Sequence, residues 1–333
     1  FSGNGFQKAF LMSAGTETTE AAFKLMRMYG QKEQKKKLGV ICFEGNWHGR
    51  TMASQMMSGN KQQKEWIGYH DKNIHHLPFP YPWLVDERSA EKFLTKSLNT
   101  IKKKINLKED VCGVMLESFQ GWGAVFYPKK YVQLLAKICK KNNILIAFDE
   151  MQAGFGRTGK NFGFEHYGIK PDLICCGKGM GGGIAVSGVR GKKKVMDLPE
   201  IGNMSSTNSA NPIACSAGLA VIEEIEKNKL TLQSKHKGII LHKGLKNIAK
   251  KFPNLFKVYG KGLIAAMVFN TKINKINYKL RLVVEESMKK GLLLCYTGRE
   301  SIKIGPPLTI SKEAIIEGLA VIDESLKKIF SHG

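Results

Sequence analysis

Long apolar stretches and paired cysteines are both missing from this sequence. No run of about 18 residues is apolar and free of charge, so no transmembrane helix is predicted. The seven cysteines are odd in number and include no C-x-x-C pair. Several lie in apolar runs, where cysteine behaves as a small buried hydrophobe. This usage argues against a disulfide framework and indicates a reducing compartment. We therefore expect a cytoplasmic protein without a membrane partner.

Acidic residues are also scarce, with 28 Asp and Glu against 52 Lys and Arg, which gives a formal net charge of +24. A charge of this size is compatible with a nucleic-acid partner. The lysines are dispersed, however, and no basic run alternates with aromatic residues as a single-strand groove requires. We expect a lysine-rich solvated surface and no nucleic-acid partner. His75 and His76 have no Cys or carboxylate at ligand spacing, so we expect no metal.

Short apolar runs alternate with segments of helical period. The runs of strand length are 8–12, 38–43, 111–116, 144–149 and 172–177. Continuous runs with β-branched residues suit strands that are buried on both faces of a parallel sheet. Helical patterns cover 16–29 and 131–141, and we expect Gly30 to end the first of these helices. The pattern indicates a doubly wound α/β domain, mainly parallel, with ligands at the carboxyl ends of the strands.

The amino-acid pattern changes beyond about residue 230, where it becomes typical of helices and rich in lysine. An apolar run covers 262–269, and the chain closes with an amphipathic helix. Its apolar residues step by four, three, four and three: Ile315, Leu319, Ile322, Leu326 and Ile329. We expect a large ligand-binding domain over 1–230 and a smaller α+β domain over 231–333.

Two polar residues follow apolar runs at positions that suit chemistry. Lys178 comes at the end of one run, with four glycines in the next five residues. Desolvation there would lower the pKa of its amine toward the nucleophilic form. Asp149 ends another run, where a buried carboxylate needs a cationic or N–H partner, such as a pyridinium nitrogen. The alternatives are a snorkelling lysine and an aspartate that caps the next turn.

Two further segments have features of a ligand site. The segment 13–20 follows a predicted strand and opens a helix, so the amides of Gly15 and Thr16 suit a phosphate. Trp47, beside His48 near a glycine turn, offers a flat ring for stacking on a planar cofactor. The alternatives are an ordinary helix start and a core aromatic.

A third glycine-rich segment, 154–160, contains G-x-G-x-x-G but does not leave its strand directly, so we discount a dinucleotide fingerprint.

Seven segments in order resemble motifs of the class III aminotransferases, which include the ornithine, acetylornithine and 4-aminobutyrate aminotransferases. These segments are SAGTETTE, WHGRT, LESFQGWG, FDEMQAGFGRTGK, PDLICCGKGMGGG, SSTNSANP and IKIGPPLTI. The resemblance runs from about residue 8 to the end and implies a fold type I enzyme that depends on pyridoxal 5'-phosphate. Members of this family normally have a substantial segment ahead of SAGTETTE, so we expect the chain to lack its N-terminal segment.

The resemblance implies a role for each matching residue. Lys178 would form the Schiff base with the cofactor and shuttle the proton, while Asp149 would keep the ring nitrogen protonated. Gln152 would donate to the phenolic oxygen of the ring. Trp47 takes the stacking position next to His48.

Two contacts to phosphate groups are also implied. Gly15 and Thr16 would bind the phosphate of the chain's own cofactor. Thr207 matches a threonine that reaches the phosphate in a neighbouring subunit, which implies a homodimer with shared active sites.

The chain departs from the family on the substrate side, to which Glu117 also belongs. Ornithine and 4-aminobutyrate members have a glutamate and an arginine that pair, where this chain has Trp122 and Lys303. Lysine cannot offer the bidentate fork that recognises a carboxylate. A cation–π contact between Trp122 and Lys303 would contribute about 0.5–2 kcal/mol. We expect carboxylate recognition to be weakened or moved, in favour of a bulkier or less acidic amine.

The sequence therefore predicts an aminotransferase that moves an amino group from a primary or ω-amine to a 2-oxo acid by a ping-pong route. An aminomutase or another pyridoxal phosphate enzyme on the same scaffold is the first alternative. A non-catalytic basic binding protein is the second.

Overall fold

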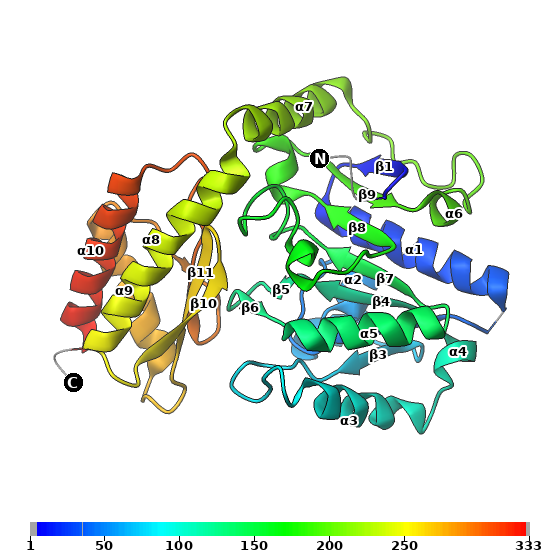
Figure 1. The fold of residues 1–333 in the computed structure, drawn as a ribbon, viewed down its shortest axis with the longest axis horizontal. Coiled ribbons are helices and arrows are strands. Elements are labelled where there is room, and N and C mark those ends of the chain that lie inside the picture. The colour runs from blue at the N-terminus through cyan, green and yellow to red at the C-terminus, as the bar shows by residue number, and fades with distance from the viewer. Residues whose placement is uncertain (1–4, 35, 331–333) are drawn as a thin grey trace. The chain divides into compact units, whose positions relative to one another are not determined.

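A computed structural model describes residues 5–34 and 36–330, which divide into two compact units (Figure 1). The larger unit contains the described residues up to 119 together with 127–155 and 162–224. The smaller unit contains 120–126, 156–161 and the residues from 225 onward. Two short segments from the first half of the chain therefore belong to the smaller unit.

The larger unit is built on a seven-stranded sheet (Figure 1). The strands, in spatial order, are β1 (Lys8–Met12), β9 (Ser187–Gly191), β8 (Leu173–Cys176), β7 (Leu145–Asp149), β4 (Val111–Glu117), β2 (Gly39–Phe43) and β3 (Ile74–Leu77). The five strands from β8 to β3 are parallel, while β9 is antiparallel to both of its neighbours. The expected mainly parallel sheet is confirmed. The sequence did not predict β9, because a strand that contains two glycines and an arginine is not a continuous apolar run.

Alternate residues of the central strands face opposite sides of this sheet. Ala147 of β7 lies in the same buried cluster as Leu25 of α1 (Gly15–Glu33). The next residue, Phe148, faces the other side, where its ring centroid is 6.1 Å from that of Tyr167. Both faces of the sheet are thus covered, and the polar ends of the strands are left to form a site.

The remaining helices lie in the larger unit or begin in it. The α-helices are α2 (Met52–Met57), α3 (Ala90–Lys102), α4 (Leu107–Asp110), α5 (Lys129–Lys141), α6 (Lys193–Met196) and α7 (Pro212–Lys227), and the 3-10 helices are η1 (Gln62–Ile67), η2 (Gly163–Tyr167) and η3 (Lys178–Gly181). The short η2, not a long helix, follows the glycines at 154–159. A dinucleotide fingerprint is therefore correctly discounted.

The smaller unit has a four-stranded antiparallel sheet and three long helices. Its strands, in spatial order, are β10 (Phe256–Lys261), β11 (Ile264–Phe269), β13 (Ser301–Ile304) and β12 (Cys295–Tyr296). Its helices are α8 (Leu230–Lys251), α9 (Ile276–Lys289) and α10 (Lys312–Phe330). The short strands β5 (Phe119–Gln120) and β6 (Val125–Phe126) pair with each other. The predicted apolar face of α10 is confirmed, because Ile315, Ile322 and Leu326 are buried in the core.

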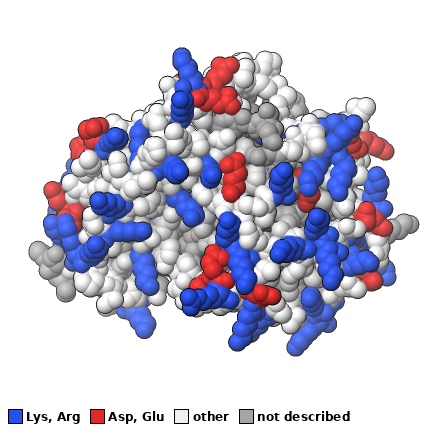
Figure 2. Space-filling model, viewed as in Figure 1, with Lys and Arg blue, Asp and Glu red and all other residues white. Residues whose placement is uncertain are grey.

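The surface matches the expected dispersal of charge. Figure 2 shows Lys and Arg side chains spread over the face in view, with acidic side chains between them. Among the residues that the structure describes, no helix combines the length and the apolar character that a membrane span requires.

The prediction that Gly30 ends the first helix is wrong, because α1 continues to Glu33. A Cβ atom at Gly30 would lie 2.0 Å from the carbonyl oxygen of Lys37 and 2.5 Å from the Cβ of Cys112. Glycine at this position therefore serves close packing within the helix. The helix ends at Gln34, whose backbone is extended.

A buried carboxylate joins the end of β7 to η2. Glu150 is fully buried and accepts hydrogen bonds from the amides of Gly163 (2.7 Å) and Phe164 (2.8 Å) and from the hydroxyl of Ser118. These donors favour the charged form, but burial opposes it more strongly and raises the pKa of Glu150 from 4.5 to about 7. Glu150 therefore fixes the segment that follows Asp149.

Replacing Gly30 with alanine should destabilise the protein, although alanine is the better helix former. Overpacking against the backbone of Lys37 should lower the free energy of unfolding by about 1–3 kcal/mol. Gly218→Ala in α7 is the matched control, because a Cβ atom there would have only ordinary contacts, 3.6 Å or more away. That control should gain about 0.5–1 kcal/mol in urea unfolding. Equal stability of Gly30→Ala and wild type would contradict the packing argument.

Stability should depend on pH through Glu150. Because its pKa is higher in the folded protein (about 7) than in the unfolded chain (4.5), folding takes up a proton between these values. The contribution is complete below the lower pKa and is lost as pH rises through the higher one, by up to about 3 kcal/mol. Urea unfolding across this range should show that loss in wild type but not in Glu150→Gln. The exposed Glu109→Gln variant should behave like wild type.

Candidate active site

The carboxyl ends of the parallel strands bring the predicted residues to one edge of the large sheet. Asp149 ends β7 and is in register with Glu117 on β4. Lys178 follows the end of β8, and Trp47 and His48 lie in the loop after β2. Since β2, β4, β7 and β8 are neighbours, these residues converge as a parallel sheet requires.

Asp149 is the central carboxylate of this edge, and its exposure is only 4%. Its Oδ2 atom lies 2.9 Å from Nδ1 of His48, and its Oδ1 atom accepts a hydrogen bond of 3.0 Å from the amide of Met151. The second contact is the turn cap that the sequence left open as an alternative. A carboxylate offers about four acceptor positions, so capacity for another donor remains. Within the described residues, Nε2 of the buried His48 has no hydrogen-bond partner.

The N-terminus of α1 begins three residues after β1 ends, as predicted. The carboxylate of Glu17 accepts hydrogen bonds from the amides of Ser13 and Ala14. In the described part of the chain, the amides of Gly15 and Thr16 have no acceptor, as is normal for the first turn of a helix. This end of α1 can therefore hold an anion.

Met151 lies between the helix terminus and the segment that carries Lys178. A Cβ atom at Gly15 would be 2.8 Å from Sδ of Met151, and one at Gly177 would be 2.6 Å from it. Met151 therefore packs closely against the backbone at both glycines, and a side chain at either position would require the end of the methionine to shift. Met151 gives no signal in the sequence, because an apolar residue between Asp149 and Gln152 resembles ordinary core.

A set of hydroxyl groups ties α1 to the loop that contains Trp47 and His48. The hydroxyl oxygens of Thr16 and Thr51 are 2.7 Å apart, and Thr19 donates to the carbonyl of His48 (2.7 Å). A Cβ atom at Gly49 would lie 2.4 Å from the hydroxyl of Thr16. These contacts join residues some 30 positions apart in sequence, for which no local pattern exists.

Lys178 is exposed and has a φ of +32°, in a region that few residues other than glycine adopt. A strained backbone of this kind costs about 1–3 kcal/mol and is often retained for function. Its exposure leaves the amine accessible to a ligand. Gln152 is half-buried, whereas Thr207 is exposed.

Trp47 is held by contacts on its backbone and its ring. Its amide donates to Oε2 of Glu117 (3.0 Å), and the guanidinium of Arg50 lies 4.6 Å from the centroid of its ring. Glu117, expected on the substrate side, thus positions the loop that carries Trp47.

Trp122 and Lys303 both belong to the smaller unit. The indole N–H of Trp122 donates to Oε1 of Gln120 (2.7 Å), and Ser301 donates to the carbonyl of Trp122. The guanidinium of Arg299 lies 3.9 Å from the centroid of the Trp122 ring. Arg299 could not be found from the sequence, because no spacing rule connects it with Trp122.

The residues at the carboxyl edge of the larger unit fit pyridoxal 5'-phosphate. This cofactor needs an anion site for its phosphate, a carboxylate for its ring nitrogen and a primary amine for its aldehyde. The first turn of α1, the buried Asp149 and the exposed Lys178 supply these three groups.

Comparison with known proteins gives a consistent family. The family model described as aminotransferase class III matches residues 2–326. An acetylornithine aminotransferase of Caldanaerobacter subterraneus is 31% identical over 97% of this chain and 76% of its own length. One of Prochlorococcus marinus is 33% identical over 96% and 73%. A solved (S)-enantioselective omega-transaminase from Thermomicrobium roseum has a TM-score of 0.90 and 25% identity, over 99% of this chain and 76% of that one.

The match over nearly the whole described chain explains why the seven motifs occur in order and why the fold is that of a transaminase. Members of this family transfer an amino group between an amine donor and a 2-oxo acid with pyridoxal 5'-phosphate as cofactor. The protein therefore belongs to the class III aminotransferases and is a pyridoxal phosphate-dependent transaminase.

Proposed function

We propose that the carboxyl edge of the large sheet is the active site, with Lys178 as the residue that bonds to the cofactor. The observation that carries this proposal is the convergence of Lys178, the Asp149–His48 pair and the first turn of α1. Gly15 and Thr16 would hold the phosphate, and Trp47 and Gln152 would contact the ring. His48, which touches Asp149 and is buried, acts as a positioning residue.

The chemistry divides among these side chains. Bound pyridoxal phosphate supplies an electron sink for the carbanion that forms at the substrate carbon. Lys178 moves the proton at that carbon, since its exposed amine is accessible to a substrate bound at this edge. Asp149 keeps a proton on the ring nitrogen, because a buried carboxylate is stabilised by a charged donor.

The donor we propose is a primary or ω-amine, and the acceptor is a 2-oxo acid, in a ping-pong sequence. The relatives named acetylornithine aminotransferases support a donor of this class. A ping-pong route follows if one site serves both substrates in turn.

Recognition of the acceptor carboxylate is the point at which we propose a difference from ornithine and 4-aminobutyrate aminotransferases. Trp122 and Lys303 replace the glutamate and arginine that the resemblance assigns to these positions. The cation found over Trp122 is Arg299, whose guanidinium is also 3.1 Å from Glu300. An arginine stacked on an aromatic ring keeps its N–H edges available for a carboxylate.

Two further expectations belong to this proposal. We propose a homodimer in which Thr207, exposed in the single chain, reaches the phosphate bound by the partner subunit. We also propose a cytoplasmic location, which the buried free cysteines support.

Lys178→Ala should lose the covalent attachment of the cofactor and reduce transamination by at least about 10²–10⁴-fold. The measurement is the visible absorption band that wild type acquires with pyridoxal phosphate, followed by borohydride reduction and mass spectrometry to locate the modified lysine. Lys72→Ala, also exposed, is the control and should keep the band. Modification at another lysine in wild type would contradict the assignment.

The same absorption band tests whether donor and acceptor react in two separate steps. An amine donor alone should bleach the band, and a 2-oxo acid should restore it. Turnover without any acceptor would indicate an aminomutase.

Restoring the family pair should restore carboxylate recognition. Trp122→Glu combined with Lys303→Arg should raise kcat/KM for 2-oxoglutarate by about 10–100-fold, because one bidentate charged contact contributes about 1.5–3 kcal/mol. Each single change alone should give little, since the pair acts as a unit. Two results together would contradict this proposal. The double variant would be no better than the single ones, and wild type would turn over 2-oxoglutarate at a rate that Lys303→Ala does not alter. They would show that carboxylate recognition has not moved.

A further inference from the structure

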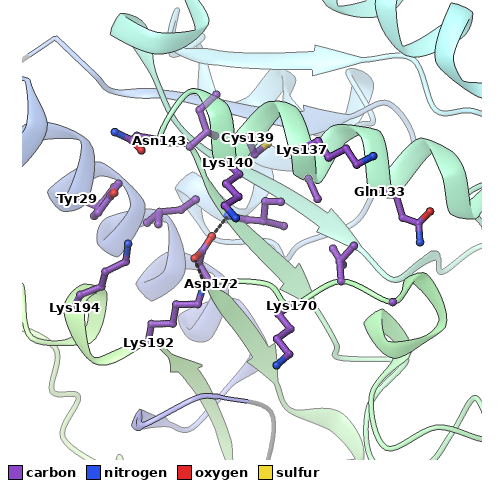
Figure 3. A pocket seen from close by; sticks show the side chains of 16 residues that line it. Tyr29, Gln133, Lys137, Cys139, Lys140, Asn143, Lys170, Asp172, Lys192 and Lys194 are labelled. Carbon is purple, nitrogen blue, oxygen red and sulfur yellow. Dashed lines mark hydrogen bonds and ion pairs between the residues drawn. The ribbon is translucent and has the colours of Figure 1, made fainter.

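A cavity of about 730 Å³ lies in the larger unit, away from the residues assigned above (Figure 3). Its walls come from α5, from the segment 168–172 that leads into β8, from residues 192–194 and from α1. Leu145 begins β7 at this cavity, whereas Asp149 ends the same strand at the active-site edge. The cavity therefore lies at the amino edge of the sheet, and its size is typical of small-molecule sites.

Five lysines line this cavity and only one carboxylate does. They are Lys137, Lys140, Lys170, Lys192 and Lys194. The carboxylate of Asp172 is already engaged, because Oδ1 is 2.6 Å from Nζ of Lys192 and Oδ2 accepts a hydrogen bond of 2.9 Å from the amide of Ile146. Among the described residues, Lys137, Lys140 and Lys170 form no ion pair. The excess positive charge of the cavity thus has no internal partner.

The lysines come from separate segments that meet only in the folded chain. Lys137 and Lys140 are one turn apart on α5, while Lys170 and Lys194 belong to later loops and helices (Figure 3). Lys137, Lys140 and Lys170 are exposed, so their ammonium groups are accessible to a bound anion, which would add favourable charge pairs.

The remainder of the lining is apolar and aromatic. Ala136, Ile144 and Ile169 line the cavity, and the ring of Tyr29 carries the ammonium of Lys194 at 5.7 Å from its centroid. Burial raises the pKa of Tyr29, with Glu33 and Asp172 adding to the effect, so its phenol stays neutral and can donate a hydrogen bond. A purely inorganic anion would leave this apolar surface unused.

We propose that this cavity binds a nucleoside polyphosphate, with the phosphates among Lys137, Lys140 and Lys170 and the flat base against the apolar lining. The ligand combines several negative charges with a planar body, as the two kinds of lining require. The site is independent of the transamination chemistry, so its test does not depend on the proposed active-site roles.

The test is calorimetric titration of ATP into the protein loaded with pyridoxal phosphate, at physiological salt. The absorption spectrum of the cofactor should stay unchanged, which separates this site from the phosphate site at α1. Wild type should bind ATP more tightly than inorganic tripolyphosphate or adenosine. The triple variant Lys137→Gln, Lys140→Gln, Lys170→Gln should bind ATP at least about tenfold more weakly, because it loses three charged donors.

Two further variants separate a built site from the general positive field. Lys72→Gln, Lys92→Gln, Lys96→Gln changes the net charge equally with exposed lysines outside the cavity, and should alter binding less than about twofold at this salt concentration. Ala136→Phe fills the cavity without changing charge and should abolish binding while the cofactor band is kept.

Four results would overturn the proposal. The first is that ATP does not bind, and the second is that both triple variants weaken ATP binding equally. The third is that tripolyphosphate binds as tightly as ATP. The fourth is that a single-stranded oligonucleotide displaces ATP and both triple variants weaken this competition equally. The last result would identify a nucleic-acid surface instead.

Discussion

The contact between Asp149 and His48 is the interaction on which the arrangement of the proposed active site depends. Asp149 lies at the end of a fully buried strand, where an isolated carboxylate would be unfavourable by several kcal/mol. His48 and the amide of Met151 satisfy its oxygens, so the charge can remain in the sheet edge. The loop after β2 is thereby joined to the end of β7. The same loop carries Trp47, and Glu117 holds its amide, so three strands share one polar network.

Close packing at glycines has a second influence on this site. Gly15 and Gly177 both pack closely against the side chain of Met151, which would have to shift if either carried a Cβ atom. They let the first turn of α1 and the start of η3 approach the same methionine. Gly30 likewise allows close packing near the other end of α1, where the helix contacts Lys37 and Cys112. The high glycine content of the chain thus reflects close approach of backbone segments as well as turns.

The parallel sheet separates two kinds of chemistry within the larger unit. Its carboxyl edge presents a buried carboxylate and a strained lysine, whereas its amino edge is surrounded by lysines around Asp172. Strand direction decides which residues reach which edge. The segments that follow the parallel strands lie at the carboxyl edge, whereas Lys192 and Lys194 reach the amino edge because they follow the antiparallel β9. The scattered positive charge of the sequence gathers around the cavity where α5 and the segment before β8 meet.

The sequence by itself determined the class of fold and singled out Asp149 and Lys178 as candidate site residues. Continuous apolar runs predicted β1, β2, β4, β7 and β8 to within about two residues, since buried parallel strands leave a strong local signal. Asp149 and Lys178 could be chosen because each follows such a run. Gly30 was misjudged because a glycine that ends a helix and one that packs inside it look alike in sequence.

Only the tertiary structure decided the partners of these residues. The pairing of His48 with Asp149 and the packing of Met151 against Gly15 and Gly177 join positions far apart in the chain. The stacking of Arg299 on the ring of Trp122 and the gathering of five lysines around one cavity also depend on residues that are distant in sequence. Local periodicity reports which face of an element is buried, but it contains no information about which distant side chain lies opposite. That information arises when the strands take their order in the sheet.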